Sequence, residues 1–224
     1  MRRLVLQSLN RLKYGRYYSA PLQPFSLLWI SPSEIQQYPA SKPKTRMLFP
    51  SSVVDGDWDL NLNWFANGIV FRSFRERFIL KKCWSETPYY QFVLDQIEKN
   101  GQYKGYTDYR DVDSRCKELD RLFFQISTGG YLSQQELDNN KQETLHRHLH
   151  LPSEMREVTV DVSRRGKMLW RGGAHRLAIA KLLDIDEIPV RIDVRHESWQ
   201  ELRDRVYNGG SVETNLADHP DLQF

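Results

Sequence analysis

The chain has 224 residues, 40% of them hydrophobic and 27% charged, so it can bury a core and its composition excludes a disordered chain. Its net charge of +3 permits a nucleic-acid or phosphorylated partner without requiring one. Cys83 and Cys116 stand far apart without Cys-x-x-Cys spacing, which indicates neither a zinc site nor a disulfide framework. We expect one large domain, or a domain with an extension, in a reducing compartment, and therefore a cytoplasmic protein.

Residues 1–24 form a basic arm, and the pattern of residues 1–20 predicts a helix. No acidic residue occurs before Glu34, and no stretch reaches the eighteen apolar residues of a transmembrane helix. Three interpretations stay open: an arm packed on the domain, a presequence, or an amphipathic helix in peripheral contact with an anionic membrane. The basic residues are Arg2, Arg3, Arg11, Lys13 and Arg16.

Residues 25–112 predict a helical, aromatic-rich region that packs on the core. A strand is expected at 25–30, a capped turn at 31–35, and helices at 71–82 and 87–100. Aromatic side chains between Trp58 and Tyr109 alternate with arginines and lysines, which would suit a surface for single-stranded nucleic acid. Helical spacing favours the other interpretation, in which these aromatics are core residues.

Residues 113–210 predict an α/β core, followed by a loose tail at 211–224. An amphipathic helix at 113–127 ends at a Gly-Gly pair, and alternating EVTVDV at 157–162 predicts a strand. The remaining elements expected in this core are a strand at 168–170, a helix from 174, a strand at 188–194 and a helix at 196–209. The predicted fold class is therefore α/β.

The sequence RGGAHR, at 171–176, lies between a predicted strand and a predicted helix. Gly172 and Gly173 let a ligand or another strand approach the backbone closely. The first N–H groups of a helix bind anions, phosphate above all. The helix expected here begins with Ala174. Positive charges at His175 and Arg176, in the first turn, oppose the helix dipole. They weaken the helix slightly unless something negative lies among them. This mismatch indicates a phosphate-bearing ligand, although a Gly-Gly turn before a helix is also common in purely structural roles.

The order of elements from Leu119 to Arg195 resembles the ParB/sulfiredoxin-like superfamily, and this third of the chain carries the likeness. Gly173, His175 and Arg176 match the G-x-H-R motif, and an alanine-bearing helix and an IPV strand follow it. Sulfiredoxins read G-G-C-H-R here, free-serine kinases D-G-x-H-R, and ParB proteins G-x-R-R. The resemblance points to a prokaryotic branch of the superfamily with its own N-terminal elaboration.

The resemblance implies that the phosphates of ATP, ADP or CTP bind at this loop. Gly172, Gly173 and Ala174 would offer N–H groups, His175 and Arg176 would contact phosphate oxygens, and Arg171 precedes them. His175 is also a candidate catalytic residue. Because Ala174 replaces the reactive cysteine of sulfiredoxins, reduction of sulfinic acid through that residue is excluded. The chain after Arg195 is too short for the helix-turn-helix domain of ParB proteins.

A second candidate site is DGDWDLNLN, where acidic and amide side chains alternate from Asp55 to Asn63. In a strand these side chains would share one face, and Mg²⁺ prefers such oxygen ligands. Asp57 and Asp59 are the predicted metal ligands, and one of Asp55, Asp57 and Asp59 would bind Mg²⁺ or act as a general base. A solvated acidic turn is the alternative.

Two further clusters carry weaker predictions. HRHLH at 146–150 would present alternate histidines to a metal, but a surface cluster without function is favoured. RIDVRH at 191–196 places Arg191, Asp193 and Arg195 on one face. One of these arginines could reach the anion, but pairing with Asp193 at the edge of the sheet is preferred.

The sequence predicts a nucleotide-binding protein, with phosphoryl transfer to an unidentified acceptor or nucleotide hydrolysis as its chemistry. Two alternatives remain. One is a nucleic-acid-binding or nuclease-like module, in which the same loop would hold a backbone phosphate. The other is a non-catalytic interaction domain, in which the side chains of the loop bind one another.

Overall fold

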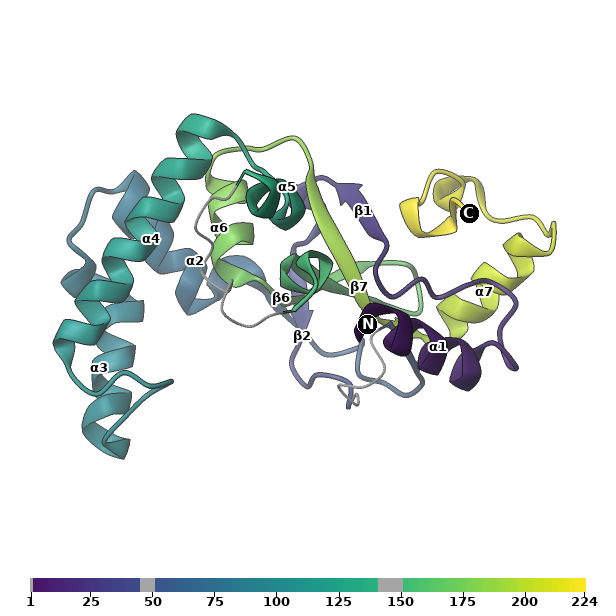
Figure 1. Cartoon of the computed structure of the whole chain (residues 1–224), viewed down its shortest axis with the longest axis horizontal. Coiled ribbons are helices and arrows are strands. Elements are labelled where there is room, and N and C mark those ends of the chain that lie inside the picture. Colours follow the sequence, from purple (N-terminus) through teal and green to yellow (C-terminus); the bar gives the residue numbers. More distant parts are fainter. Residues whose placement is uncertain (1, 45–50, 141–150) are drawn as a thin grey trace. The chain divides into compact units, whose positions relative to one another are not determined.

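A computed structural model describes residues 2–44, 51–140 and 151–224 and confirms an α/β fold on a mixed seven-stranded sheet (Figure 1). The chain divides into two compact units. The sheet unit comprises Met1–Phe65, Ser133–Gly173 and Asp186–Phe224, and the helical unit comprises Ala66–Leu132 and Ala174–Ile185.

The strands of the sheet unit run in the order β1-β7-β5-β6-β2-β4, and β3 pairs with β7 outside this path. Parallel pairs (β5 with β7, β3 with β7, β2 with β6) alternate with antiparallel ones. The bounds are β1 Leu27–Ile30, β2 Gln37–Pro39, β3 Ser52–Val54, β4 Leu62–Trp64, β5 Val158–Val162, β6 Met168–Gly172 and β7 Ile188–His196.

The nine-residue strand β7 lies inside the sheet, and the predicted edge position of its 191–196 segment is wrong. Strand β5 pairs along β7, while β1 pairs with Ile188–Arg191 and β3 with Val194–His196. Neighbours on both edges satisfy the backbone of this strand, and its mostly apolar sequence IPVRIDV is typical of a strand inside a sheet. The apolar residues Val190, Ile192 and Val194 are at most 4% exposed.

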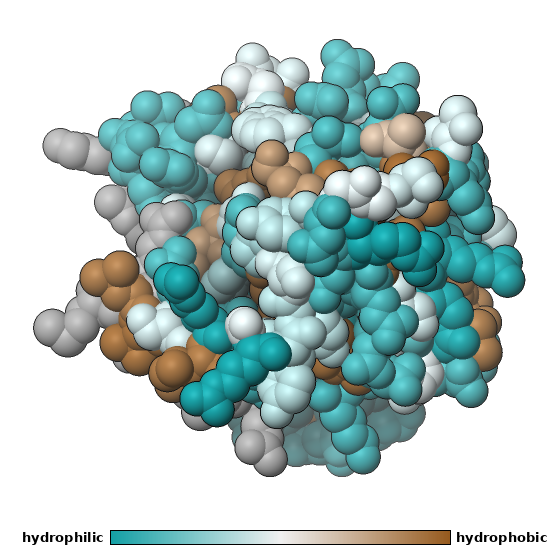
Figure 2. Space-filling view, turned by 90° about the vertical axis from the view of Figure 1, so that its right-hand side faces the viewer, coloured by the Kyte–Doolittle hydropathy of each residue, from teal (hydrophilic) through white to brown (hydrophobic). Residues whose placement is uncertain are grey.

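Three helices belong to the sheet unit: α1 Arg2–Tyr14, α5 Gln134–Asn139 and α7 Glu197–Tyr207. The predicted N-terminal helix is confirmed by α1, whose Asn10 is buried and donates to the carbonyl of Ser51. Leu4, Val5 and Leu12 of α1 are exposed. None of the helices in the described ranges is long and apolar enough to cross a membrane. Figure 2 shows that the face on the right of Figure 1 is mostly hydrophilic, with apolar side chains in separate patches.

The end of the chain is packed at Asp221 and Leu222, which are buried, whereas residues 211–218 are mostly exposed. The loose tail predicted for residues 211–224 is therefore wrong at its end. Asp221 is 4% exposed and accepts from Arg195 at 2.6 and 2.9 Å and from the Trp199 indole at 2.8 Å. The Arg203 Nε lies 3.3 Å from the same carboxylate. Burial alone would raise the pKa of Asp221, but the two arginines hold it below its usual value. A single carboxylate therefore anchors the C-terminal segment by compensating two buried cations.

The helical unit contains α2 Ile69–Phe74, α3 Pro88–Asn100, α4 Tyr109–Gly129 and α6 Ala174–Leu182. Helix α2 continues as a π-helical turn over Arg75–Ile79, so the helix predicted at 71–82 begins two residues earlier and ends three earlier. Side chains of Thr87 and Asp108 cap α3 and α4. The fully buried residues Phe74, Val93, Leu119 and Leu177 form the core of this unit.

The two units do not follow the domain boundaries predicted after residues 24, 112 and 210. Strands β1–β4, from the predicted helical region, belong to the same sheet as β5–β7, whereas α4, assigned to the predicted core, belongs to the helical unit. The physical reason is strand length, because β2, β3 and β4 have three residues each and are too short for a recognisable alternation.

Replacing Asp221 is expected to destabilise the sheet unit strongly. Asp221→Ala would leave Arg195 and Arg203 buried without their shared carboxylate, which costs about 3–5 kcal/mol. Urea unfolding measures this difference, with Asp218→Ala as control. Asp218 is exposed and lies three residues before Asp221, and its loss should change the unfolding free energy by less than about 0.5 kcal/mol. Equal effects of the two substitutions would contradict the anchoring role of Asp221.

Candidate functional site

The Gly-Gly turn joins β6, which ends at Gly172, to α6, which begins at Ala174. A Cβ on Gly172 would lie 2.6 Å from the Thr159 hydroxyl, and one on Gly173 would lie 2.9 Å from the Cα of Val158. Gly173 also has a φ of +77°, where a side chain is strained. Both glycines are therefore needed for the close approach of strand β5. From the sequence, either a ligand or another strand could approach the backbone here, and the structure shows a strand.

Two register shifts flank the middle of β5. Between β5 and β6, the partner of Thr159 is Gly172 and the partner of Val160 is Trp170, so Arg171 has no counterpart. Between β5 and β7, Val160 pairs with Ile192 and Asp161 with Val194, so Asp193 has no counterpart. Bulges of this kind redirect side chains and are frequent next to active sites.

The two bulges bring together a cluster of charged side chains around Arg171. Its guanidinium donates to Asp161 Oδ2 at 2.9 Å and lies 2.6 Å from Asp193 Oδ2. Arg191 Nη2 donates to the other oxygen of Asp193 at 2.9 Å. Lys42 Nζ donates to the backbone carbonyl of Arg171 at 2.7 Å. Three cations thus meet two carboxylates, which leaves the cluster positive when both carboxylates are ionised.

Asp161 is the most deeply buried member, with a side chain that is 0% exposed. Burial raises its pKa to about 7, against the opposing effect of the Arg171 guanidinium. Within the described residues, Asp161 Oδ1 and the Nε and Nη1 atoms of Arg191 are buried without a hydrogen-bond partner. Buried polar atoms are satisfied in most proteins, and exceptions require an explanation such as a ligand or ion.

His175 and Arg176, the other predicted phosphate ligands, belong to the helical unit. His175 stacks on Phe74 with ring centroids 5.7 Å apart, and its Nδ1 lies 3.5 Å from a guanidinium nitrogen of Arg115. Arg176 is 8% exposed, donates to the Tyr131 hydroxyl at 3.0 Å and to the carbonyl of Leu132, and packs on the Tyr131 ring. Both side chains therefore have contacts within their own unit.

The acidic segment after β3 forms a turn, not the strand in which its side chains would share one face. The side chains of Asp55 and Asp57 are 72% and 78% exposed, whereas Asp59 is 2% exposed. Asp59 accepts from the Arg164 backbone and guanidinium, which hold its pKa below the usual value despite the opposing effect of burial. No group of three potential metal-binding side chains occurs among residues 2–44, 51–140 and 151–224. Asp59 is thus held by Arg164 in a structural ion pair, and Arg164 also donates to Asp57.

The histidine cluster at 146–150 lies outside the described residues. The sequence interpretation missed Asp161 and gave Asp193 only a pairing role. A signal was present, because VDV in β5 and IDV in β7 each place one aspartate between branched apolar residues. A charge in that position is buried wherever the strand lies inside a sheet.

Comparison with known proteins adds no assignment: no family model, no curated protein and no solved structure matches the chain.

Gly173→Ala is expected to destabilise the protein by about 1–3 kcal/mol, because the added methyl meets β5 and the backbone angle is unfavourable. Chemical denaturation measures the change. Gly129→Ala, at the last residue of α4 with no atom within 4 Å of the added methyl, is the matched control and should be neutral or stabilising. A Gly173→Ala protein as stable as the control would contradict the close approach.

The raised pKa of Asp161 predicts a pH dependence of stability. Because the folded state holds this proton up to about pH 7 and the unfolded state loses it near pH 4, stability falls as pH rises between these values. The contribution of this group to the slope is at most about 1.4 kcal/mol per pH unit. Urea unfolding across this range should show a shallower decline in Asp161→Asn, which cannot ionise. Identical slopes in the two proteins would contradict the raised pKa.

Proposed function

We propose that the protein binds a nucleotide through its phosphates at the Gly-Gly turn and the charged cluster around Arg171, and that it transfers or hydrolyses a phosphoryl group. One observation carries the proposal. Asp161 and Asp193 converge on Arg171, next to Arg191, whose Nε and Nη1 atoms are buried and have no hydrogen-bond partner among the described residues. A phosphate oxygen is the natural acceptor for such donors, because guanidinium groups bind phosphate through paired hydrogen bonds.

Electrostatics supports an anionic ligand. Arg171, Arg191 and Lys42 exceed the two carboxylates by one charge. Helix α6 begins directly after Gly173 in the chain, and the start of a helix carries partial positive charge. ATP, ADP and CTP all present the phosphates that such a site prefers. The motif resemblance to the ParB/sulfiredoxin-like superfamily supports the same class of ligand.

Asp161 has the properties of a general base in this proposal. A catalytic base works best with a pKa near the working pH, and burial brings this carboxyl to about 7. Its Oδ1, which has no partner within the described residues, would accept the proton of an attacking hydroxyl or water. Mg²⁺, which proteins often hold through one or two carboxylates and the phosphates of the substrate, is the alternative partner of this oxygen, because one oxygen cannot hold the metal ion and accept the proton at the same time. Asp161 thus replaces Asp55, Asp57 and Asp59 as the proposed acid–base residue.

The binding test is isothermal titration with ATP, ADP, CTP and GTP, with and without Mg²⁺. Ala174→Glu introduces a negative charge in the first turn of α6, which favours the helix but repels phosphate. It should weaken binding at least about tenfold, equivalent to 1.4 kcal/mol, without lowering the melting temperature. Ser114→Glu adds the same charge at an exposed position of α4 and should leave binding unchanged. Absence of saturable binding, or equal binding by Ala174→Glu and wild type, would contradict the proposal.

Catalysis is tested separately by phosphate release from the bound nucleotide. Asp161→Asn keeps the size of the side chain but removes the base, so turnover should fall by about 10²–10⁴-fold while nucleotide affinity stays within a few fold. Unchanged turnover in Asp161→Asn would exclude Asp161 as the general base.

A further inference from the structure

The segment IVFRSFRERFILKK, residues 69–82, concentrates the positive charge of the helical unit. It contains five arginines and lysines and one acidic residue, Glu76. Two of the cations have internal partners, since Arg77 pairs with Asp120 and Lys82 with Glu76. Arg72 and Arg75 are exposed and have no carboxylate partner in the part of the chain that the structure describes. These two guanidinium groups are therefore available to an external anion.

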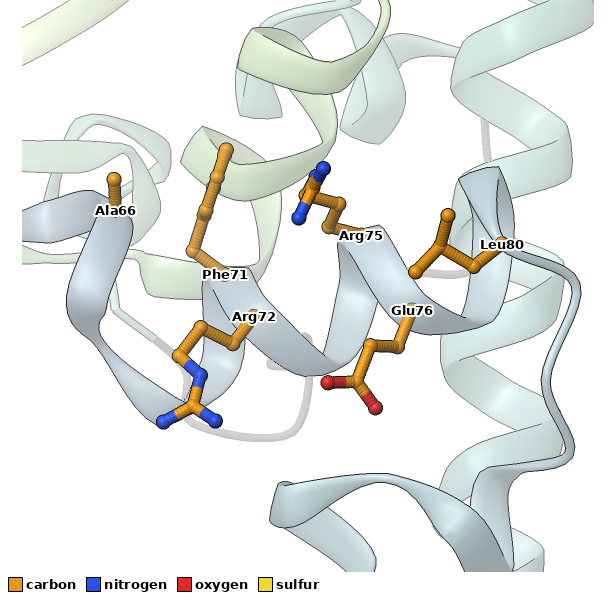
Figure 3. A pocket seen from close by; sticks show the side chains of 6 residues that line it. All are labelled: Ala66, Phe71, Arg72, Arg75, Glu76 and Leu80. Carbon is orange, nitrogen blue, oxygen red and sulfur yellow. The ribbon is translucent and has the colours of Figure 1, made fainter.

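Arg72 and Arg75 line a hollow of about 320 Å³ on α2 and the π-helical turn that follows it. Figure 3 shows that Phe71, Arg75 and Leu80 project on one side of the helix, and Arg72 and Glu76 on the other. The hollow is lined by Ala66, Phe71, Arg72, Arg75, Glu76 and Leu80. π-Helical turns inside α-helices often occur at functional sites, because the extra residue redirects the side chains around it.

We propose that this hollow binds single-stranded nucleic acid, with a base against Phe71 and backbone phosphates at Arg75, on the same side of the helix, and at Arg72, on the other side. Base stacking on aromatic side chains and phosphate contacts by cations are the two general elements of single-strand recognition. Both elements are present here within five residues of one helix.

The arrangement of the two arginines favours a strand over a free nucleotide. Figure 3 shows the two arginine side chains on opposite sides of the helix, so they face different phosphates. Each internal nucleotide of a strand has a phosphate on both sides of its base, whereas a free nucleotide carries phosphates on one side. An acidic peptide would satisfy the arginines but offers no flat ring for Phe71.

Fluorescence anisotropy with a labelled oligothymidine of about twelve nucleotides tests the proposal, since single-strand sites span about 4–16 nucleotides. Saturable binding is expected at low salt. The double variant Arg72→Gln/Arg75→Gln should reduce the slope of log affinity against log salt by about 1.4, that is about 0.7 for each lost phosphate contact. Phe71→Leu should weaken binding by about 5- to 150-fold through the lost stacking.

The control Arg110→Gln/Arg121→Gln removes the same number of charges at exposed positions of α4 and should retain the wild-type slope. Circular dichroism melting checks that every variant folds. Free ATP and polyglutamate, as competitors, should displace the oligonucleotide poorly.

Absence of oligonucleotide binding, equal slopes in the two double variants, or efficient competition by polyglutamate would overturn the proposal. Ala174→Glu should bind the oligonucleotide as wild type does, so this site and the proposed nucleotide site can fail independently.

Discussion

The ion pairs from Arg171 to Asp161 and Asp193 join the side chains of three neighbouring strands, β6, β5 and β7, at the centre of the sheet. Two bulges, at Arg171 in β6 and at Asp193 in β7, flank the same part of β5, and the Arg171 guanidinium there reaches both Asp161 and Asp193. Removing charges from water is costly, and apolar residues of similar size often stabilise a fold as well or better. A cluster with a fully buried carboxyl and two unpartnered guanidinium donors is therefore hard to explain by stability alone.

The elements that could be predicted from the sequence are those with a long, regular pattern. The alternating valines of β5 indicate a strand, and the apolar stripe of α4 indicates a helix. All three valines of β5 are fully buried. The cluster around Arg171 could not be predicted in this way, because it depends on which strands are neighbours and on a one-residue offset in each pair. The Asp59–Arg164 pair joins residues 105 positions apart, which periodicity does not reveal.

The glycines of RGGAHR show how one motif supports two explanations. Close contact with β5 accounts for Gly172 and Gly173 without any ligand. The same turn places Arg171 at the end of β6, so the packing that requires glycine also positions the charged cluster. In the helical unit, the exposed Arg72 and Arg75 lie on the segment 69–82 and line a hollow together with Phe71. The two units thus carry chemically different candidate sites.

The most direct test of the central claim is a carbon-13 NMR titration of the Asp161 carboxyl, with and without a magnesium nucleotide. The account predicts a carboxyl that titrates near pH 7 in the free protein and whose titration shifts when the nucleotide is added. A carboxyl that titrates near its ordinary value of about 4, and that does not respond to any nucleotide, would contradict both the buried cluster and its proposed role.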